Sequence, residues 1–177
     1  MSWQEKFAVV QGRGQNVCVG LDPVRAQFPA ALAKDVSPTR NFLRAIVDAT
    51  AMHAGAFKPN YAFFEGEGIP GLSYLHSVIA HIRDKTRIPI ILDCKRADIG
   101  ATNSGSARAM FDEFEADAVT VNPYFGGEAL EPFLERSDEC IFVLCRTSNP
   151  GAREFQEQIV LVKPEDTERW GLPQDIQ

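Results

Sequence analysis

Two lysines and two aspartates form a potential reactive cluster in the middle of the chain. Asp93 and Lys95 are separated by one residue, Asp98 follows three residues later, and Lys58 ends an earlier apolar run. Residues two apart in a strand point to the same side, so Asp93 and Lys95 should project together while Cys94 points away. Alternating cations and anions in a dry cleft hold one another in place. The spacing therefore predicts an ordered charged site.

A structural salt-bridge network without chemistry is the alternative for this cluster. Four charges at two neighbouring strand ends favour a functional site, because buried charges are costly unless they are paired and a fold rarely needs so many in one place. Asp22 is more ambiguous, since Leu21-Asp22-Pro23 also fits a turn that simply ends a strand.

The elements that must position these residues alternate along the sequence. Short apolar runs predict buried parallel strands at 17–21, 54–57, 88–92, 118–121 and 141–144. Apolar residues at helical spacing lie between the runs: Phe42, Ile46 and Ala49; Leu72, Leu75, Ile79 and Ile82; Ala107, Met110, Phe111 and Phe114. Ser37-Pro38 indicates a helix start, and Gly126-Gly127 opens a short helix holding Leu130, Phe133 and Leu134.

This βαβαβαβαβ order fits either an open doubly wound sheet or a closed (β/α)8 barrel. Charged or amide residues follow nearly every strand, namely Asp22, Lys58, Asp93, Asn122 and Arg146. Functional groups at the carboxyl ends of several strands are typical of a barrel active site, whereas the glycine-rich dinucleotide motif is missing. We predict an incomplete (β/α)8 (TIM) barrel of about five β/α units. Residues 1–160 form the N-terminal part of one barrel domain, and 161–177 form a divergent polar tail.

Composition excludes several classes of protein. The 177 residues have a formal net charge of −6, which argues against nucleic-acid binding because such proteins concentrate basic residues. No apolar run approaches the roughly 20 residues that span a bilayer, and no signal pattern opens the chain. The four cysteines form no CxxC pair and predict reduced, mostly buried thiols. We expect a cytoplasmic protein without a metal site and without a membrane or nucleic-acid partner.

Four segments resemble successive motifs of the orotidine 5'-phosphate decarboxylase family, specifically its longer bacterial branch. They are CVGLDP at 18–23, FKPNYAFFE at 57–65, LDCKRADIGAT at 92–102 and LCRTSNPGA at 144–152. The D-x-K-x-x-D-I-G-x-T string is very specific among barrels, and the resemblance covers about residues 15–158. It implies the cofactor-free conversion of orotidine monophosphate to uridine monophosphate in de novo pyrimidine synthesis.

The resemblance also implies roles for the charged cluster. Lys95 matches the acid that protonates C6 of the pyrimidine, and Asp93 lies beside the scissile carboxylate. Lys58 and Asp98 would hold that pair.

Three further residues match substrate-binding positions of the family. Asp22 corresponds to a ligand of the ribose hydroxyls, Thr102 to a residue near the ribose and phosphate, and Ser148 to the serine that hydrogen-bonds the pyrimidine ring. Asp98 and Thr102 reach the partner's site in this family, which implies a homodimer with shared active sites.

The chain departs from the family pattern after Gly151, where no glycine- and glutamine-rich phosphate motif follows. A (β/α)8 barrel usually takes about 250 residues. A truncated or frame-shifted product, one piece of a split enzyme, or an inactive remnant that keeps a binding or dimerising role are the three explanations that we consider.

Two other chemistries stay open. Magnesium-dependent keto-sugar-phosphate decarboxylases of the same superfamily share a DxKxxD string, although FKPNYAFFE and RTSNPGA favour the orotidine branch. A Schiff-base aldolase that uses Lys95 is disfavoured, because flanking carboxylates keep a lysine charged rather than nucleophilic.

Overall fold

The computed structural model describes residues 1–32 and 35–159, so the predicted tail at 161–177 lies outside the described residues. The chain divides into two compact units, one of residues 1–144 and a second that begins at Cys145. The described strands all belong to the first unit. The second contains a short 3-10 helix, η5 (Pro150–Glu154).

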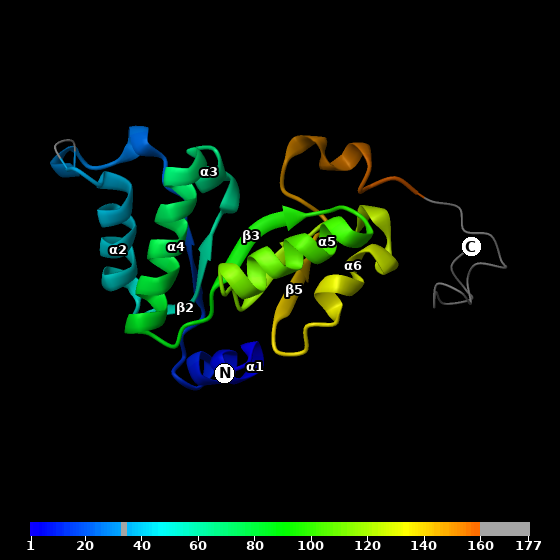
Figure 1. Cartoon of the computed structure of the whole chain (residues 1–177), viewed down its shortest axis with the longest axis horizontal. Helices are drawn as coiled ribbons and strands as arrows, with labels where there is room; N and C mark the ends of the chain where they lie inside the picture. Colours follow the sequence, from blue (N-terminus) through cyan, green and yellow to red (C-terminus); the bar gives the residue numbers. More distant parts are fainter. Residues whose placement is uncertain (33–34, 160–177) are drawn as a thin grey trace. The chain divides into compact units, whose positions relative to one another are not determined.

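Five short strands form the centre of the first unit (Figure 1). Their bounds are β1 (Val17–Leu21), β2 (Ala54–Pro59), β3 (Ile91–Arg96), β4 (Ala118–Val121) and β5 (Cys140–Val143). All five were expected from the apolar runs. β3 starts later than predicted, because Ile90 forms only a single bridge to Phe57, and it continues to Arg96 through the charged residues.

The strands are parallel and follow the order of the chain. β1 pairs with β2, and β3 pairs with β4, which pairs with β5. Two isolated parallel bridges, Phe57 to Ile90 and Asn60 to Asp93, connect β2 with the β3 segment. A doubly wound sheet reverses its strand order at a switch point, whereas a barrel adds each strand beside the previous one. The sequential order therefore favours the barrel arrangement.

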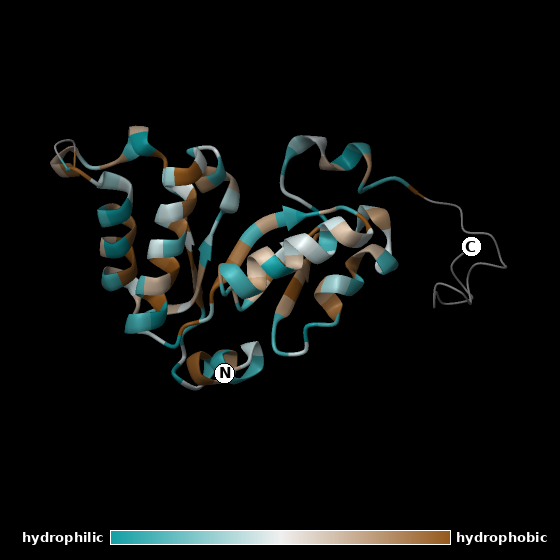
Figure 2. Cartoon of the chain, viewed as in Figure 1, coloured by the Kyte–Doolittle hydropathy of each residue, from teal (hydrophilic) through white to brown (hydrophobic). Residues whose placement is uncertain are grey.

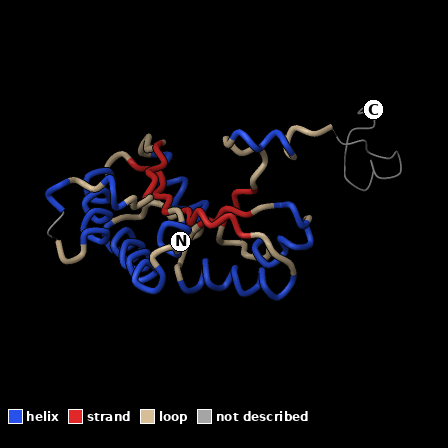
Figure 3. The backbone as a smooth tube through the Cα atoms, turned by 90° about the horizontal axis from the view of Figure 1, so that it is seen from above, coloured by secondary structure: helices blue, strands red, loops and turns tan. Residues whose placement is uncertain are grey.

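Helices connect the strands and lie along them (Figure 3). Their bounds are α1 (Trp3–Gly12), α2 (Pro38–Thr50), α3 (Tyr61–Glu65), α4 (Gly68–Lys85), α5 (Gly100–Ala107) and α6 (Gly127–Leu134). α5 continues as a π-helical segment, η3 (Arg108–Glu113), and short 3-10 turns lie at η1 (Arg25–Gln27), η2 (Ala30–Leu32) and η4 (Pro123–Phe125).

Side chains alternate between the two faces of the strands. The face toward the helices holds the main core, including Phe57, Leu92 and Val119, which are fully buried. We call the opposite face of the strands the inner face. The strand registers place five side chains next to one another on it: Cys18, Ala56, Ile91, Ala118 and Cys140. Most of these line an apolar cavity of about 480 Å³ with Trp3 and Phe7 of α1.

Polarity changes along the strands. In Figure 2, β3 is hydrophobic over its first half and hydrophilic at its carboxyl end. The apolar half stabilises the fold by burial, and the polar end is left to position functional groups.

Two helices differ from the sequence expectation. α2 buries Leu43 and Val47 fully, and the predicted Phe42 and Ile46 are partly buried against the same core. Ala49 is exposed, so that position was wrong. α1 was not expected, although Ser2 and Glu5 form a capping box whose spacing is visible in the sequence.

The cysteines also differ from expectation. Cys18 and Cys145 are exposed, and Cys94 and Cys140 are half-buried, so the thiols are free but not mostly buried. Cys18 is exposed because it lies on the inner face beside the apolar cavity.

Candidate active site

The carboxyl ends of three neighbouring strands bring charged and hydroxyl side chains together on the inner face. Lys58 lies two residues beyond Ala56 on β2, Asp93 two beyond Ile91 on β3, and Thr120 two beyond Ala118 on β4. The period of two along each strand therefore places all three polar groups on the same side as the apolar cavity.

The Asp93 carboxylate accepts three hydrogen bonds. Lys58 Nζ lies 2.9 Å from Oδ2, and Lys95 Nζ lies 2.6 Å from Oδ1. Thr120 Oγ1 donates to Oδ1 over 2.8 Å. The Asp93 side chain is only 8% exposed, whereas the Lys95 side chain is 49% exposed. The anion is thus fixed inside the site while one ammonium group faces the open side.

These contacts set the ionisation of the site. Burial alone raises the pKa of Asp93, but hydrogen bonds from Lys58, Lys95 and Thr120 outweigh it and lower the pKa from 3.8 to about 2. Burial likewise lowers the pKa of Lys58, but the hydrogen bond and charge of Asp93 outweigh it, with help from the charge of Asp22, and the net shift is upward. Both groups are therefore charged at neutral pH.

Lys95 has an unusual backbone conformation. Its φ is +45°, a left-handed value that costs a non-glycine residue about 1–2 kcal/mol. The backbone N–H of Lys95 donates to Thr120 Oγ1 over 2.9 Å. Non-glycine residues in strained conformations cluster at functional sites, where the surrounding structure holds them.

Sequence reasoning missed Thr120. The residue is buried, and its hydroxyl contacts both Asp93 and Lys95. The available signal was a single hydroxyl within the apolar run Ala118–Val121, because a buried polar group needs partners.

Asp98 lies apart from this cluster within the chain. Its carboxylate accepts a hydrogen bond from the Ile99 N–H over 2.8 Å, and no ion pair joins it to Lys58 or Lys95 in the described part of the chain. The buried Asn103 donates to the Asp98 carbonyl over 2.6 Å and to the Ala129 carbonyl, which ties the loop after β3 to α6. One chain therefore assembles three members of the predicted four-charge array.

The predicted substrate-binding residues are exposed. Asp22 follows β1 and is close enough to Lys58 to influence its pKa, and Thr102 lies in the first turn of α5. Ser148 belongs to the second unit, where a loop is held by the hydrogen bond from the Thr147 N–H to Gln156 Oε1, at 2.7 Å.

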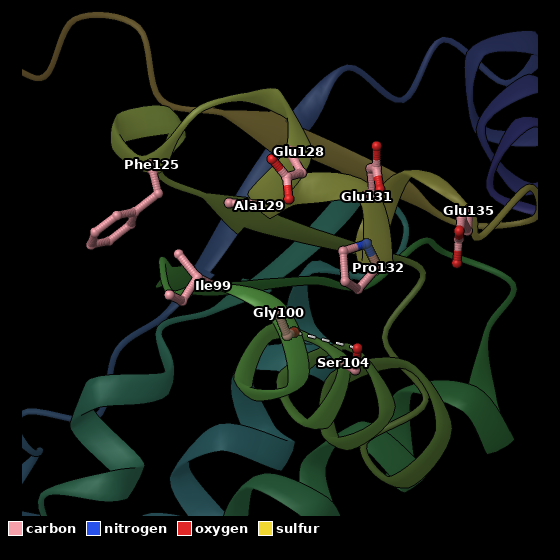
Figure 4. A pocket seen from close by; sticks show the side chains of 9 residues that line it. All are labelled: Ile99, Gly100, Ser104, Phe125, Glu128, Ala129, Glu131, Pro132 and Glu135. Atoms are coloured by element: carbon pink, nitrogen blue, oxygen red, sulfur yellow. Dashed lines mark hydrogen bonds between the residues drawn. The ribbon is translucent and has the colours of Figure 1, made fainter.

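A groove of about 410 Å³ runs between α5 and α6, next to the Asp98 loop (Figure 4). Ile99 and Phe125 lie on one side of it, and both are more than half exposed. Glu128, Glu131 and Glu135 of α6 and the segment after it supply its charged lining.

Two kinds of feature are absent from the described residues. No group of three or more His, Cys, Asp or Glu side chains there is placed to hold a metal ion. None of the described helices is both long enough and apolar enough to cross a membrane.

The sequence pattern of the family described as "Orotidine 5'-phosphate decarboxylase / HUMPS family" matches residues 15–170. The chain belongs to this family. The orotidine 5'-phosphate decarboxylase of Roseiflexus sp. (strain RS-1) is 47% identical over 158 residues, which cover 89% of this chain and 57% of the relative. That of Herpetosiphon aurantiacus is 43% identical and is covered to 59%. The chain thus spans somewhat less than three fifths of these relatives' length.

Solved structures of the family share the fold. Leishmania donovani OMP decarboxylase is 37% identical with a TM-score of 0.79, covering 90% of this chain and 60% of that one. A putative orotidine-monophosphate decarboxylase from Toxoplasma gondii is 40% identical with a TM-score of 0.81, covering 89% and 53%. These proteins are TIM barrels, and the five parallel β/α units correspond to an incomplete (β/α)8 barrel, as predicted.

Proposed function

We propose that this chain carries the proton-donating site of an orotidine 5'-phosphate decarboxylase, which converts orotidine monophosphate to uridine monophosphate in pyrimidine synthesis. The observation that supports this most directly is the Lys58–Asp93–Lys95 array at the carboxyl ends of β2 and β3. The names of the relatives, at 43–47% identity, point to the same reaction.

The chemistry explains the need for a fixed ammonium group. When the bond between C6 and the carboxylate breaks, carbon dioxide leaves and the electron pair stays on C6. No adjacent carbonyl delocalises this pair, so stabilisation has to be electrostatic. Lys95 places a positive charge at the open side of the site, and transfer of its proton to C6 completes uridine monophosphate. Lys95 is then neutral and regains a proton from solvent.

Asp93 has two roles in this proposal. It orients the Lys95 ammonium group through the 2.6 Å contact, and its carboxylate lies beside that of the substrate. Because three hydrogen bonds hold Asp93 before substrate arrives, little reorganisation is needed during the reaction. The reaction needs no metal or organic cofactor, since a lysine alone supplies both charge and proton.

We assign the remaining contacts to residues outside the array. Asp22, beside Lys58, binds the ribose hydroxyls, Thr102 contacts the ribose and phosphate region, and Ser148 hydrogen-bonds the pyrimidine ring. We also place the protein in the cytoplasm, because that compartment keeps thiols reduced and nucleotide synthesis takes place there.

We further propose a homodimer with shared active sites. Asp98 has no cationic partner among the described residues of its own chain, and Ile99 and Phe125, on one side of the groove next to its loop, are 62% and 53% exposed. Apolar side chains gathered in this way favour a protein interface. A second copy that covers them would receive Asp98 at its own Lys95.

The test is an assay of purified chain for loss of orotidylate absorbance, with uridine monophosphate identified by chromatography. A chimera that joins residues 1–158 to the remaining C-terminal part of the Roseiflexus relative is assayed beside it. We expect decarboxylation by the chimera and its loss in the Lys95→Ala form.

Chelation separates the orotidine reaction from the magnesium-dependent alternative. The orotidine reaction should be indifferent to a chelator, whereas a magnesium-dependent keto-sugar-phosphate decarboxylase should lose activity. A folded chimera that leaves orotidylate untouched would contradict the proposed function.

A further inference from the structure

Thr120 occupies a special position in β4. It is 9% exposed, and its hydroxyl is the polar group between Ala118 and Val121, two residues without exposed surface. The hydroxyl donates to Asp93 Oδ1 over 2.8 Å and accepts the Lys95 N–H over 2.9 Å. One oxygen thus bridges a side chain and a backbone group of the reactive segment.

The strand opposite Thr120 is irregular. Leu92 is in register with Val119 and Arg96 with Val121, so three residues of β3 lie opposite the single residue Thr120. Such an irregularity interrupts the regular ladder of backbone hydrogen bonds and redirects a side chain. The Lys95 N–H, which has turned out of the ladder with φ +45°, binds the Thr120 hydroxyl instead.

We propose that Thr120 is a positioning residue that holds Lys95 in its left-handed conformation and aligns Asp93 with it. The idea rests on the proposed function for its catalytic consequence, but the positioning itself is a property of the folded chain. The side-chain hydroxyl replaces a missing backbone partner, so its removal frees the Lys95 backbone and one side of the Asp93 carboxylate.

Without the Thr120 hydroxyl, Asp93 and Lys95 should be held less precisely relative to the substrate. A displacement of about 1 Å can cost on the order of 100-fold in rate, because reactive geometry depends steeply on distance. Thr120 does not contact the substrate in this scheme, so kcat should fall and KM should change little.

Matched variants isolate the hydroxyl. Thr120→Val keeps the shape and removes the oxygen, whereas Thr120→Ser keeps the oxygen. Thr39→Val is the control, because Thr39 is also buried and its Oγ1 accepts a hydrogen bond, from Arg25 Nε at 3.2 Å, away from the array.

The first readout does not need activity. Carbon-detected NMR of the 177-residue chain follows the titration of the Asp93 carboxyl group and the Lys95 amide shift. Lys58, Lys95, Asp22 and Cys18 surround this region and are unchanged in all variants. We expect Asp93 to titrate at higher pH in Thr120→Val and the Lys95 amide signal to move, with Thr120→Ser and Thr39→Val resembling the parent chain.

The second readout is the kcat of the chimera, which should fall at least about tenfold in Thr120→Val and recover in Thr120→Ser. An inactive parent chimera would count against the proposed function. The NMR measurements would still test the positioning role of Thr120, because they do not depend on activity. If Thr120→Val fails to fold, Thr120→Ala is compared with Thr120→Ser, since these two differ only in the hydroxyl. Unchanged Asp93 titration and Lys95 amide shift in the folded variant without the hydroxyl would overturn the proposal.

Discussion

Asp93 is held by groups from three strands: Lys58 on β2, Lys95 on its own strand β3 and Thr120 on β4. Burying a carboxylate without partners is unfavourable, so these contacts decide that it stays ionised. A carboxylate fixed in this way keeps the Lys95 ammonium group oriented, so little reorganisation is needed when charge develops on a neighbouring substrate.

Replacing Lys95 tests the proton donor. In the chimera, Lys95→Ala should lower the turnover number by about a hundredfold or more, because general acids contribute on the order of 10²–10⁴. The free energy of unfolding should change by no more than about 1 kcal/mol, since the side chain is half-exposed. Lys85→Ala, at the exposed end of α4, is the control. Retention of a tenth of the parent turnover would remove Lys95 from this role.

The lowered pKa of Asp93 predicts a pH-dependent contribution to stability. The folded-state pKa of about 2 lies below the ordinary 3.8, so the ionised form stabilises the fold above about pH 4. This contribution is lost as the pH falls through the range from 4 to 2. The drop in the pKa of Asp93 from 3.8 to about 2 corresponds to at most about 2.5 kcal/mol of stability.

Chemical denaturation of the chain at pH 5 and pH 2.5 measures this loss. Asp93→Asn should show a smaller decrease in the free energy of unfolding than the parent, whereas Asp84→Asn, on the exposed end of α4, should behave like the parent. Equal decreases for the parent and Asp93→Asn would contradict the assigned ionisation.

At the scale of elements, α1 is attached to the strands by a buried ion pair. Lys6 Nζ lies 2.5 Å from Asp117 Oδ1, and the side chains are 9% and 7% exposed. Asp117 Oδ2 accepts the Ile90 N–H over 2.8 Å, so the same carboxylate links α1 to the segments that begin β3 and β4. With Trp3 and Phe7, this helix covers the amino ends of the strands.

Breaking this pair should be costly, because the buried Asp117 carboxylate then keeps only the Ile90 N–H and the Arg83 guanidinium group, 3.8 Å away. We expect Lys6→Ala and Lys6→Met each to lower the free energy of unfolding by about 3 kcal/mol. Arg13→Ala, at the exposed end of the same helix, should change it by less than about 0.5 kcal/mol. If urea denaturation shows Lys6→Met to be as stable as the parent, the ion pair does not attach α1.

At the scale of the whole molecule, the proposed dimer has active sites that two chains share. Asp98 lies beyond the end of β3, and the exposed apolar side chains of Ile99 and Phe125 line one side of the groove next to its loop. A two-fold contact through this region exchanges equivalent groups between the copies.

Mixed dimers of the chimera test the shared site. Lys95→Ala and Asp98→Ala forms should each be inactive alone. In a mixed dimer one site combines both damaged residues, and the other receives intact Lys95 and Asp98 from different subunits. Random reassortment makes about half of the dimers mixed, so activity should recover to roughly a quarter of the parent. Continued inactivity, with mixed dimers verified by native mass spectrometry, would show that Asp98 does not act in trans.

The sequence by itself determined the parallel β/α order and the pairing of Asp93 with Lys95. The β/α order follows from local rules, because apolar runs and helical spacing repeat over a few residues. The Asp93–Lys95 pair was predicted from the period of two along a strand, and the structure forms it with Lys95 in a left-handed conformation outside the regular ladder. The motif at 92–102 also pointed to the family to which the chain belongs.

Only the tertiary structure decided how distant segments meet. Thr120 reaches Lys95 across 25 residues of sequence, and Lys6 reaches Asp117 across 111. The left-handed backbone at Lys95 and the buried stripe of α2 likewise depend on neighbouring elements. Local periodicity carries no information about these contacts, because they form only when the packed strands bring remote polar groups into one low-dielectric space.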